Sequence, residues 1–262
     1  MTTHPPAAKP TIRINPRIRE RRLAVRRDAG RRRLRIVVAA VGAAASVGLA
    51  YGATRSPLFD VDTVRLEGAT RTEPAAARRA AQLDRPRQLA DVDLAEAAAA
   101  IERLPWVQRA TVTRHWPGTV KVSLLERTPV AAVGPAEQPV ALVDITGRVL
   151  DHRDDVPAGM PRIEVPAPVP APGRRVTPAT RAAVAVLDQL PAALQGEVTA
   201  IRLGDDSELE MIMADGPPVR FGPPHQVQPK LVALVTLITR ADLRRVEIID
   251  VRVPTAPVLT RR

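Results

Sequence analysis

The stretch RHWPGTVKVSLLERTPVA, from Arg114 to Ala131, decides the fold of the first globular part of this chain. It predicts a hairpin with Pro117-Gly118 in the turn, because Pro fixes φ and Gly adopts the positive φ of a type II turn. Two-residue hairpin loops favour other turn types, so we expect a slightly longer loop. The returning strand places Val120, Val122 and Leu124 on one face, the pattern of a half-buried strand.

Two further strands belong to the same sheet. Residues 107–114 predict the strand that leads into the turn, with Ala110 and Val112 on one face. Earlier in the chain, Val64 and Leu66 alternate with polar residues in a strand that ends at Gly68. This part of the chain therefore contains three short strands.

Two helices are predicted between the first and second of these strands. Thr72 is expected to be the N-cap of a short helix over residues 73–82. A second helix begins at Asp93, carries apolar residues at helical spacing and ends before Pro105. The order is β-α-α-β-β, assigned to residues 56–131.

Residues 132–254 predict a second domain, a mixed β-sheet with flanking helices, which makes the fold class α+β. ALVDITGRVLD reads as strand, turn at Thr146-Gly147 and strand, and the proline-rich residues 165–173 form a connection. Helices start at Thr177-Pro178 and near Pro229. Further strands are predicted over residues 198–203, 209–213, 219–221 and 246–253. Glu126-Arg127 is interpreted as an acid–base pair that marks the passage between the domains.

The net charge of +11 is concentrated at the N-terminus. Residues 1–35 contain 12 Lys or Arg against Glu20 and Asp28, a net +10, so the remaining residues sum to about +1. A nucleic-acid-binding domain would carry its basic surface on the folded body. We interpret residues 1–35 as a disordered basic tail in the cytoplasm, and we expect no nucleic-acid partner.

Residues 36–54 contain no charged side chain and predict a transmembrane helix. The basic residues before it place the N-terminus in the cytoplasm and the body outside, as in a single-pass type II protein. A cleaved signal peptide ending near Thr54 is the alternative. Ala44, Gly48 and Gly52 recur every four residues, a spacing that lets membrane helices pack closely, although a general bias toward Ala and Gly would produce the same pattern.

The search for catalytic chemistry finds little. The chain has no cysteine, which excludes disulfides, thiolate metal sites and a cysteine nucleophile. It also contains no phosphate-binding glycine loop, no nucleophile elbow and no zinc-protease motif. Trp106 is expected to pack under the sheet, and Trp116 to cover the hairpin end or face a partner. We expect no enzyme activity, no cofactor, no metal and no small-molecule substrate.

A resemblance to a known family rests on four stretches: LFDVDTVRLEGATRT, IERLPWVQRATVTRHWPGTVKVSLLERTPVA, LVDITGRVL and IIDVRV. Their order, and their position after a basic tail and one apolar segment, resemble the FtsQ/DivIB family of bacterial cell division proteins. The resemblance implies a POTRA domain followed by an FtsQ-type β domain. It also implies a divisome component at the division septum that helps control septal wall synthesis with FtsB-like and FtsL-like partners.

The same resemblance implies a partner site at the C-terminal end. In the family the last strands receive FtsB by strand addition, and residues 255–262 would be the C-terminal edge strand and tail. Arg252 matches a family arginine expected to meet a partner carboxylate, and Val253 replaces the usual aromatic residue. The expected contact residues are Arg252, Val253, Thr255, Val258, Leu259 and Thr260. Pro254 and Pro257 would remove backbone donors from this edge, or protect it from aggregation.

Two other classes of protein stay open on the sequence alone. One is an anchored or secreted cell-wall enzyme with an unrecognised site. The other is a POTRA subunit of an outer-membrane translocator, a class that usually has several POTRA units or a C-terminal barrel.

Overall fold

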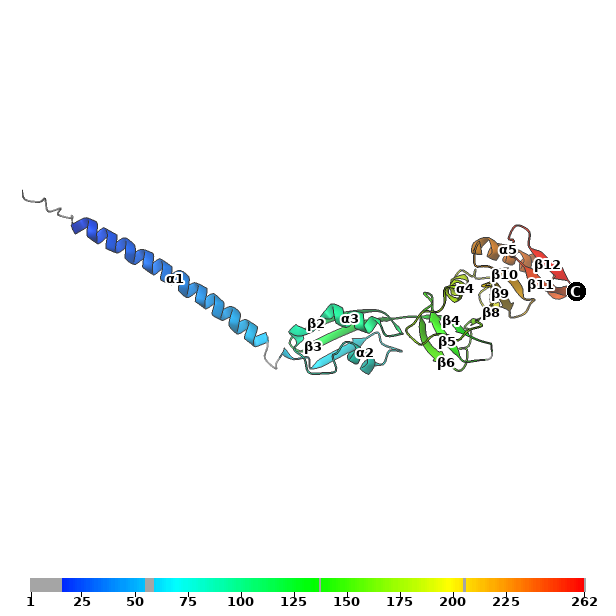
Figure 1. The fold of residues 1–262 in the computed structure, drawn as a ribbon, viewed down its shortest axis with the longest axis horizontal. Coiled ribbons are helices and arrows are strands. Elements are labelled where there is room, and N and C mark those ends of the chain that lie inside the picture. Colours follow the sequence, from blue (N-terminus) through cyan, green and yellow to red (C-terminus); the bar gives the residue numbers. More distant parts are fainter. Residues whose placement is uncertain (1–15, 55–58, 137, 205, 262) are drawn as a thin grey trace, which may run out of the picture. The chain divides into compact units, whose positions relative to one another are not determined.

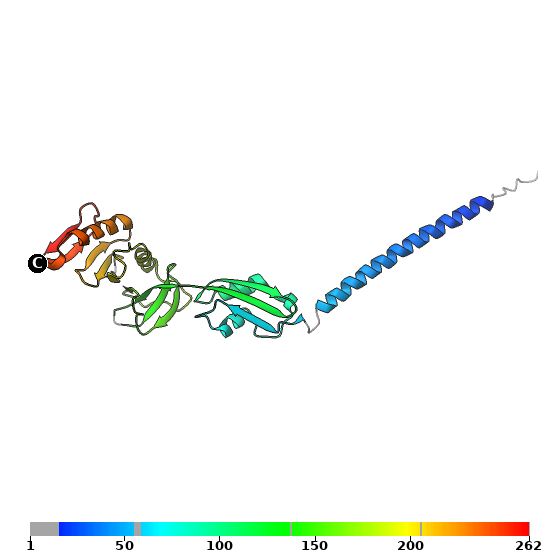
Figure 2. The same ribbon diagram turned by 180° about the vertical axis from the view of Figure 1, so that it is seen from behind.

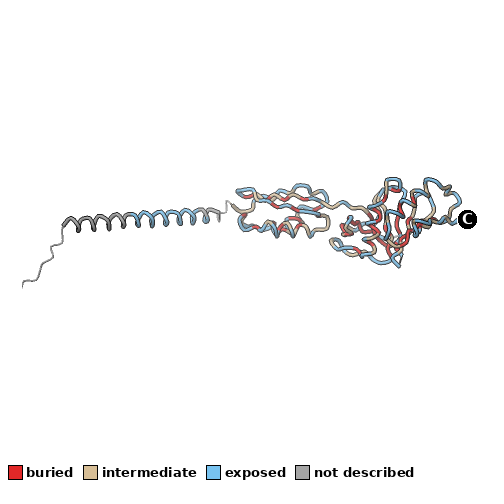
Figure 3. Tube along the Cα trace, turned by 90° about the horizontal axis from the view of Figure 1, so that it is seen from above, coloured by how far each residue is buried: buried red, intermediate tan, exposed pale blue. Residues whose placement is uncertain are grey.

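The computed structural model describes residues 16–54, 59–136, 138–204 and 206–261 (Figure 1). The chain divides into two compact units, Met1–Phe59 and Asp60–Arg262. Buried residues follow the elements of the second unit, whereas residues 32–49 of the first are exposed (Figure 3). The hydrophobic core therefore belongs to the second unit.

The first unit contains one long helix, α1 (Pro16–Thr54). This corrects the predicted disorder for residues 16–35, because Ala, Arg and Leu have high helix propensities and Pro suits the first helical position. Residues 1–15 of the predicted tail lie outside the described residues. Within the described ranges, no helix is both long enough and apolar enough to cross a membrane.

The second unit begins with the β-α-α-β-β order that the sequence predicts. Its elements are β1 (Thr63–Glu67), α2 (Pro74–Ala80), the 3₁₀ helix η2 (Leu89–Asp91), α3 (Leu94–Glu102), β2 (Val107–His115) and β3 (Thr119–Glu126). Strand β3 is central, parallel to β1 and antiparallel to β2 (Figure 1). Val120, Val122 and Leu124 are buried in one cluster with Ile101 of α3, which confirms the predicted inner face.

The hairpin turn differs from the prediction in its backbone. Residues 116–118 connect β2 to β3, so the loop has the expected extra residue, and the Trp116-Pro117 peptide is cis. Gly118 does not have a positive φ. A Cβ at this position would lie 2.6 Å from the carbonyl oxygen of Asp60 and 2.8 Å from Oδ2 of Asp62. Glycine is therefore required by the close approach of the chain before β1, not by a type II turn.

Of the two predicted helix starts in the first domain, the one at α3 is confirmed and the one at α2 is wrong. Asp93 is the N-cap of α3, and its carboxylate accepts hydrogen bonds from the N–H groups of Ala95 and Glu96. The N-cap of α2 is Glu73 rather than Thr72, and no side chain caps that helix. Pro74 sits in the first turn of α2, where its missing N–H costs nothing.

The second domain is built on one nine-stranded sheet with two helices (Figure 2). Its elements are β4 (Pro129–Gly134), β5 (Val140–Asp144), β6 (Val149–Arg153), β7 (Arg162–Glu164), α4 (Pro178–Asp188), β8 (Val198–Leu203), β9 (Leu209–Met213), β10 (Val219–Gly222), α5 (Val227–Arg240), the 3₁₀ helix η3 (Leu243–Arg245), β11 (Val246–Asp250) and β12 (Val258–Arg261). The strand order is β12-β11-β10-β9-β8-β7-β4-β5-β6.

Strand β4 places the boundary between the two domains earlier than predicted. Residues 129–131 were predicted to end the first domain, but β4 pairs with β5 and β7 of the large sheet. Pro129 begins this strand, a position where a missing N–H is tolerated. The predicted boundary at 131/132 is therefore too late. Strand β7 was not predicted, because its three residues alternate only once and give no clear period.

Both helices of the second domain pack into its main core. Val184 and Leu187 of α4, and Leu231 and Leu234 of α5, belong to one buried cluster with the central strands. Thr177 is the N-cap of α4, as predicted, with its hydroxyl oxygen 3.2 Å from the N–H of Thr180. Helix α5 begins at Val227, slightly before the predicted start.

Candidate functional site

The C-terminal strand β12 forms one edge of the nine-stranded sheet. It pairs antiparallel with β11, and Ile249 lies opposite Leu259. Leu259 packs partly against the main core, whereas Val258 is 56% exposed. Among the described residues, β12 has a neighbouring strand on one side only.

The direction of the backbone N–H and C=O groups along β12 follows from the hydrogen bonds that β11 makes toward β10 on its other side. The N–H groups of Ile249 and Val251 donate to β10 or the residue before it, at 3.1 and 3.0 Å. Because successive residues in a strand point their N–H and C=O groups to opposite sides, Asp250 and Ile248 point toward β12. Their partners Val258 and Thr260 therefore point back toward β11. Leu259 and Arg261 consequently direct their N–H groups away from the sheet.

The opposite edge of the sheet, β6, is covered by residues 170–174, at the end of the proline-rich connection and directly after it. The N–H of Val149 donates to the carbonyl of Arg174 at 2.8 Å, and the N–H of Gly173 donates to the carbonyl of Val149 at 2.8 Å. Nε2 of His152 lies 3.2 Å from the carbonyl oxygen of Pro170. The two edges of the sheet therefore differ. Among the described residues, no segment of the chain covers β12 in this way.

Two of the predicted contact residues are not where the sequence placed them. Thr255 lies in the connection 251–257, together with Pro254 and Pro257, and β12 begins only at Val258. Pro254 and Pro257 lie in this connection, where proline is favoured, so they remove no N–H from β12. Val253 was predicted to end the strand over residues 246–253, but β11 ends at Asp250 and Val253 is 58% exposed. Val258, Leu259 and Thr260 do lie in the edge strand.

Arg252 binds a carboxylate of its own chain. Its guanidinium donates to both carboxylate oxygens of Asp250, with 2.8 Å between Nη2 and Oδ2. These hydrogen bonds from Arg252 lower the pKa of Asp250, although its partial burial acts in the opposite direction. The side chain also lies over Gly222, whose φ is +70° and where a Cβ would be 2.7 Å from Cγ of Arg252. Arg252 is thus held at the end of β11 by Asp250 and lies over Gly222 of β10.

Lys230 holds the backbone around Gly222, and the sequence analysis did not identify it. Its side chain is fully buried, and Nζ donates to the carbonyl oxygens of Phe221 at 3.0 Å and Pro223 at 2.8 Å. Burial lowers the pKa of Lys230. The signal was present, because Lys230 falls at an apolar position of the α5 stripe. The lysine fixes the backbone on both sides of Gly222.

The passage between the two domains is held by separate contacts of Glu126 and Arg127. Glu126 accepts hydrogen bonds from the N–H groups of Arg71 and Thr72, rather than pairing with Arg127 as predicted. Arg127 donates to the carbonyl of Val107 at 3.0 Å and to Oδ2 of Asp144 at 2.6 Å. The side chains of Arg127 and Asp144 are 17% and 4% exposed. A buried ion pair therefore joins the two domains.

Other residues reinforce this interdomain joint. Nη2 of Arg148 donates to the carbonyl of Arg103 at 2.7 Å. Trp106 packs against a small core of the second domain that contains Leu142 and Leu150, so it is partly buried between the domains rather than under the first sheet. The guanidinium of Arg71 lies 5.3 Å from the centre of the Trp106 ring.

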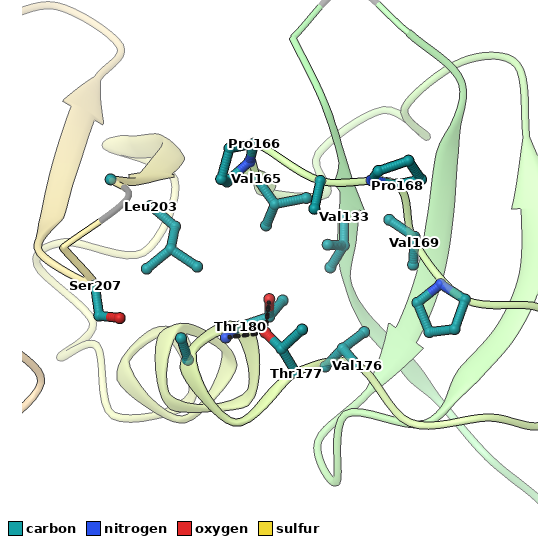
Figure 4. Close-up of a pocket in the computed structure, with 14 residues that line it drawn as sticks. Val133, Val165, Pro166, Pro168, Val169, Val176, Thr177, Thr180, Leu203 and Ser207 are labelled. Carbon is teal, nitrogen blue, oxygen red and sulfur yellow. Dashed lines mark hydrogen bonds between the residues drawn. The ribbon is translucent and has the colours of Figure 1, made fainter.

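A cavity of about 190 Å³ lies beneath the proline-rich connection (Figure 4). Its lining is mostly apolar, with Val133, Val169 and Leu203 among its residues. The hydroxyls of Thr177 and Thr180 are 2.8 Å apart and serve the start of α4. The cavity contains no acid–base pair, and nothing in its lining forms a nucleophile and a base. Among the described residues, no three acidic or histidine side chains converge on a common metal position.

The small residues proposed for helix packing lie on an open surface of α1. Ala44, Gly48 and Gly52 are exposed. A Cβ added at Gly48 or Gly52 would meet no atom within 4 Å.

Comparisons with known proteins match both domains. A family described as "POTRA domain, FtsQ-type" matches residues 59–127, and one described as "Cell division protein FtsQ/DivIB, C-terminal" matches residues 134–252. The chain is 31% identical over 240 residues to the cell division protein FtsQ of Streptomyces collinus, covering 88% of this chain and 90% of that protein. It is 28% identical over 234 residues to FtsQ of Streptomyces bingchenggensis, covering 88% and 87%.

One solved structure is also similar, the major extracytoplasmic domain of DivIB from Geobacillus stearothermophilus, in its trans isomer. It shares 21% identity and a TM-score of 0.31 over 45% of this chain and 99% of that one, a likeness too low to carry an argument. The two family matches and the relatives that span most of the chain are sufficient: the chain belongs to the FtsQ/DivIB family of bacterial cell division proteins.

Proposed function

We propose that this chain is a non-enzymatic divisome component that receives a partner strand at the free edge of β12. The observation that carries the proposal is the difference between the two edges of the sheet. Strand β6 is covered by its own chain, whereas Leu259 and Arg261 direct their N–H groups outward. Strand addition uses such backbone groups and needs no reactive side chain.

The proposed partners are FtsB-like and FtsL-like division proteins, and the proposed place is the division septum, where the complex would help control septal wall synthesis. Arg252 follows β11, the strand that pairs with β12, and its guanidinium would meet an acidic side chain of the FtsB-like strand. Val253 and Val258 would add exposed apolar surface to the same interface. The contact residues in the loop and strand are Arg252, Val253, Thr255, Val258, Leu259 and Thr260.

A matched pair of variants at Arg261 tests the strand addition. Arg261→Pro removes one outward N–H, whereas Arg261→Ala removes the side chain and keeps that N–H. Binding of the full chain to the external segment of the FtsB-like partner is measured by titration. We expect Arg261→Pro to weaken binding by roughly tenfold, about 1.4 kcal/mol, and Arg261→Ala to change it little. Equal affinities for the two variants would contradict strand addition at this edge.

Residues 36–54 are proposed as an uncleaved anchor in the cytoplasmic membrane, with the body outside the cytoplasm. The support is the uncharged run after a segment with a net +10. A reporter that is active only outside the cytoplasm should be active when fused after Arg262 and silent when fused at Asp28. The opposite pattern refutes the topology, and a mature N-terminus near Thr54 would show cleavage instead.

Ala44, Gly48 and Gly52 are proposed to pack against the membrane helix of a partner. Replacing Gly48 and Gly52 together by Leu separates the two backbones but favours membrane insertion by about 0.3–0.6 kcal/mol per residue. Co-purification with the partner should fall while insertion is kept. Unchanged co-purification would assign the small residues to composition alone.

A further inference from the structure

The end of the first domain where the chain enters from α1 carries a group of exposed residues. Two loops flank residues 60–62: the N–H of Val61 donates to the carbonyl of Arg87 at 2.8 Å, and the N–H of Asp62 donates to the carbonyl of Gly118 at 2.9 Å. We call the exposed residues of these two loops the tip surface; they are Arg85, Pro86, Arg87, Trp116 and Pro117.

Few residues of the sequence separate α1 from the chain that enters the tip surface. Only residues 55–58 separate Thr54 from Phe59. A fully extended chain covers at most about 3.6 Å per residue, so Thr54 and Phe59 can be separated by no more than roughly 18 Å. An anchor at residues 36–54 would therefore hold the tip surface within reach of the lipid headgroups.

The chemistry of the tip surface suits the interface between lipid and water. Trp116 is 53% exposed, although the sequence favoured a structural role for it at the hairpin end. Tryptophan is enriched at membrane interfaces because its ring is apolar and its N–H is polar. Arg85 and Arg87 are exposed beside it, and guanidinium groups bind phosphate oxygens with several donors at once.

The charges around the tip surface are balanced. Asp60, Asp62 and Asp84 lie on the same loops or beside them, and they offset the arginines. Arg114 is also close, but its Nε donates to the carbonyl of Leu89 at 2.9 Å. A contact made here would depend on Trp116 and on phosphate hydrogen bonds more than on an excess of anionic lipid.

We propose that the tip surface rests on the phospholipid surface of the membrane, with Trp116 in the interfacial layer and Arg85 and Arg87 on lipid phosphates. This proposal rests on the proposed anchor at residues 36–54. Three points of contact, two arginines and one tryptophan, would fix the orientation of the first domain relative to the bilayer.

Tryptophan fluorescence of the full chain in lipid nanodiscs tests the proposal. The chain has two tryptophans, Trp106 and Trp116. Phosphatidylcholine brominated near the headgroup end of its acyl chains should quench part of the wild-type emission. Trp116→Phe should remove that part and leave the emission of Trp106 unquenched. Combining Arg85→Gln with Arg87→Gln should reduce the quenching of Trp116, and unchanged quenching would overturn the role of the arginines.

The control adds a tryptophan at another exposed apolar position. Val232 on α5 is 64% exposed, and Val232→Trp in the Trp116→Phe background should give emission that brominated lipid does not quench. If the chain elutes with the nanodiscs and Trp116→Phe is quenched as much as the wild type, or neither is quenched, the tip contact is refuted and the anchor stands. A chain that does not elute with the nanodiscs overturns the anchor and this contact with it.

Discussion

At the scale of single residues, two glycines are required by side chains or backbone that come from distant parts of the sequence. Gly118 leaves room for the chain at Asp60 and Asp62, and Gly222 leaves room for Arg252. The sequence predicts a glycine turn at Pro117-Gly118, but the reason for the glycine depends on a contact across 58 positions of the chain. Local turn rules describe φ and ψ, and they contain no information about such contacts.

Gly118→Ala should lower the thermal stability of the first domain. The new Cβ would overlap the carbonyl oxygen of Asp60, and forcing extra volume into a packed site costs about 1–3 kcal/mol. Gly216→Ala is the matched control, because its Cβ would have no neighbour nearer than 3.5 Å. Thermal unfolding of the full chain measures both. A Gly118→Ala midpoint equal to that of Gly216→Ala would rule out the close approach.

Arg252→Glu should weaken binding of the FtsB-like partner and leave the fold intact. The change removes the cation that is proposed to meet the partner and places a second carboxylate next to Asp250. We expect a loss of roughly tenfold or more in affinity, at 1.4 kcal/mol for each factor of ten. Arg244→Glu makes the same charge change at a highly exposed position of the same domain. Unchanged binding by Arg252→Glu, at an unchanged melting temperature, would place the partner site elsewhere.

At the scale of elements, segments with a clear period were predicted, whereas the three-residue strand β7 was not. Helix α3 and strands β2 and β3 carry enough alternating or helical repeats to identify them. Strand β7 has three residues, and it becomes a strand only because β4 and β8 lie on either side of it. The loop that holds Pro254 and Pro257 was read as part of the edge, since a sequence does not reveal where β11 turns back toward β12.

The ion pair between Arg127 and Asp144 predicts how the interdomain joint responds to acid. Burial acts to raise the pKa of Asp144, but hydrogen bonds from Arg148, Thr146 and Arg127 outweigh it and lower the pKa below its ordinary 3.8. A carboxylate with a lowered pKa stabilises the folded state above its unfolded pKa, and this stabilisation is lost as the pH falls through the folded pKa.

Asp144→Asn should therefore destabilise the protein most at neutral pH. Removing one member of a buried pair costs about 3–5 kcal/mol. This difference from wild type should shrink as the pH falls below 3.8 and through the lower pKa of the folded state, where the wild-type carboxylate also becomes protonated. Denaturant unfolding at a series of pH values measures it. Asp151→Asn removes an exposed pair with Arg153 and should cost less than about 1 kcal/mol. A difference for Asp144→Asn that does not vary with pH would contradict the ion pair.

At the scale of the whole molecule, the chain builds a nine-stranded sheet and leaves its two edges in different states. The family resemblance pointed to the C-terminal edge as the partner site. The sequence could not show that the other edge is covered, because the covering residues 170–174 lie about twenty positions after β6. The backbone direction at Leu259 likewise depends on how β10 pairs with β11, which no local pattern contains.

Amide hydrogen exchange at Leu259 and Arg261 tests the central claim most directly. Their N–H groups point away from the sheet, so they should exchange quickly in the full chain alone. With the external segment of the FtsB-like partner bound, strand addition predicts slow exchange at both amides, while the exchange at Leu150 in the covered edge β6 stays unchanged. Fast exchange at Leu259 and Arg261 in the presence of saturating partner would contradict the claim that the partner adds a strand to β12.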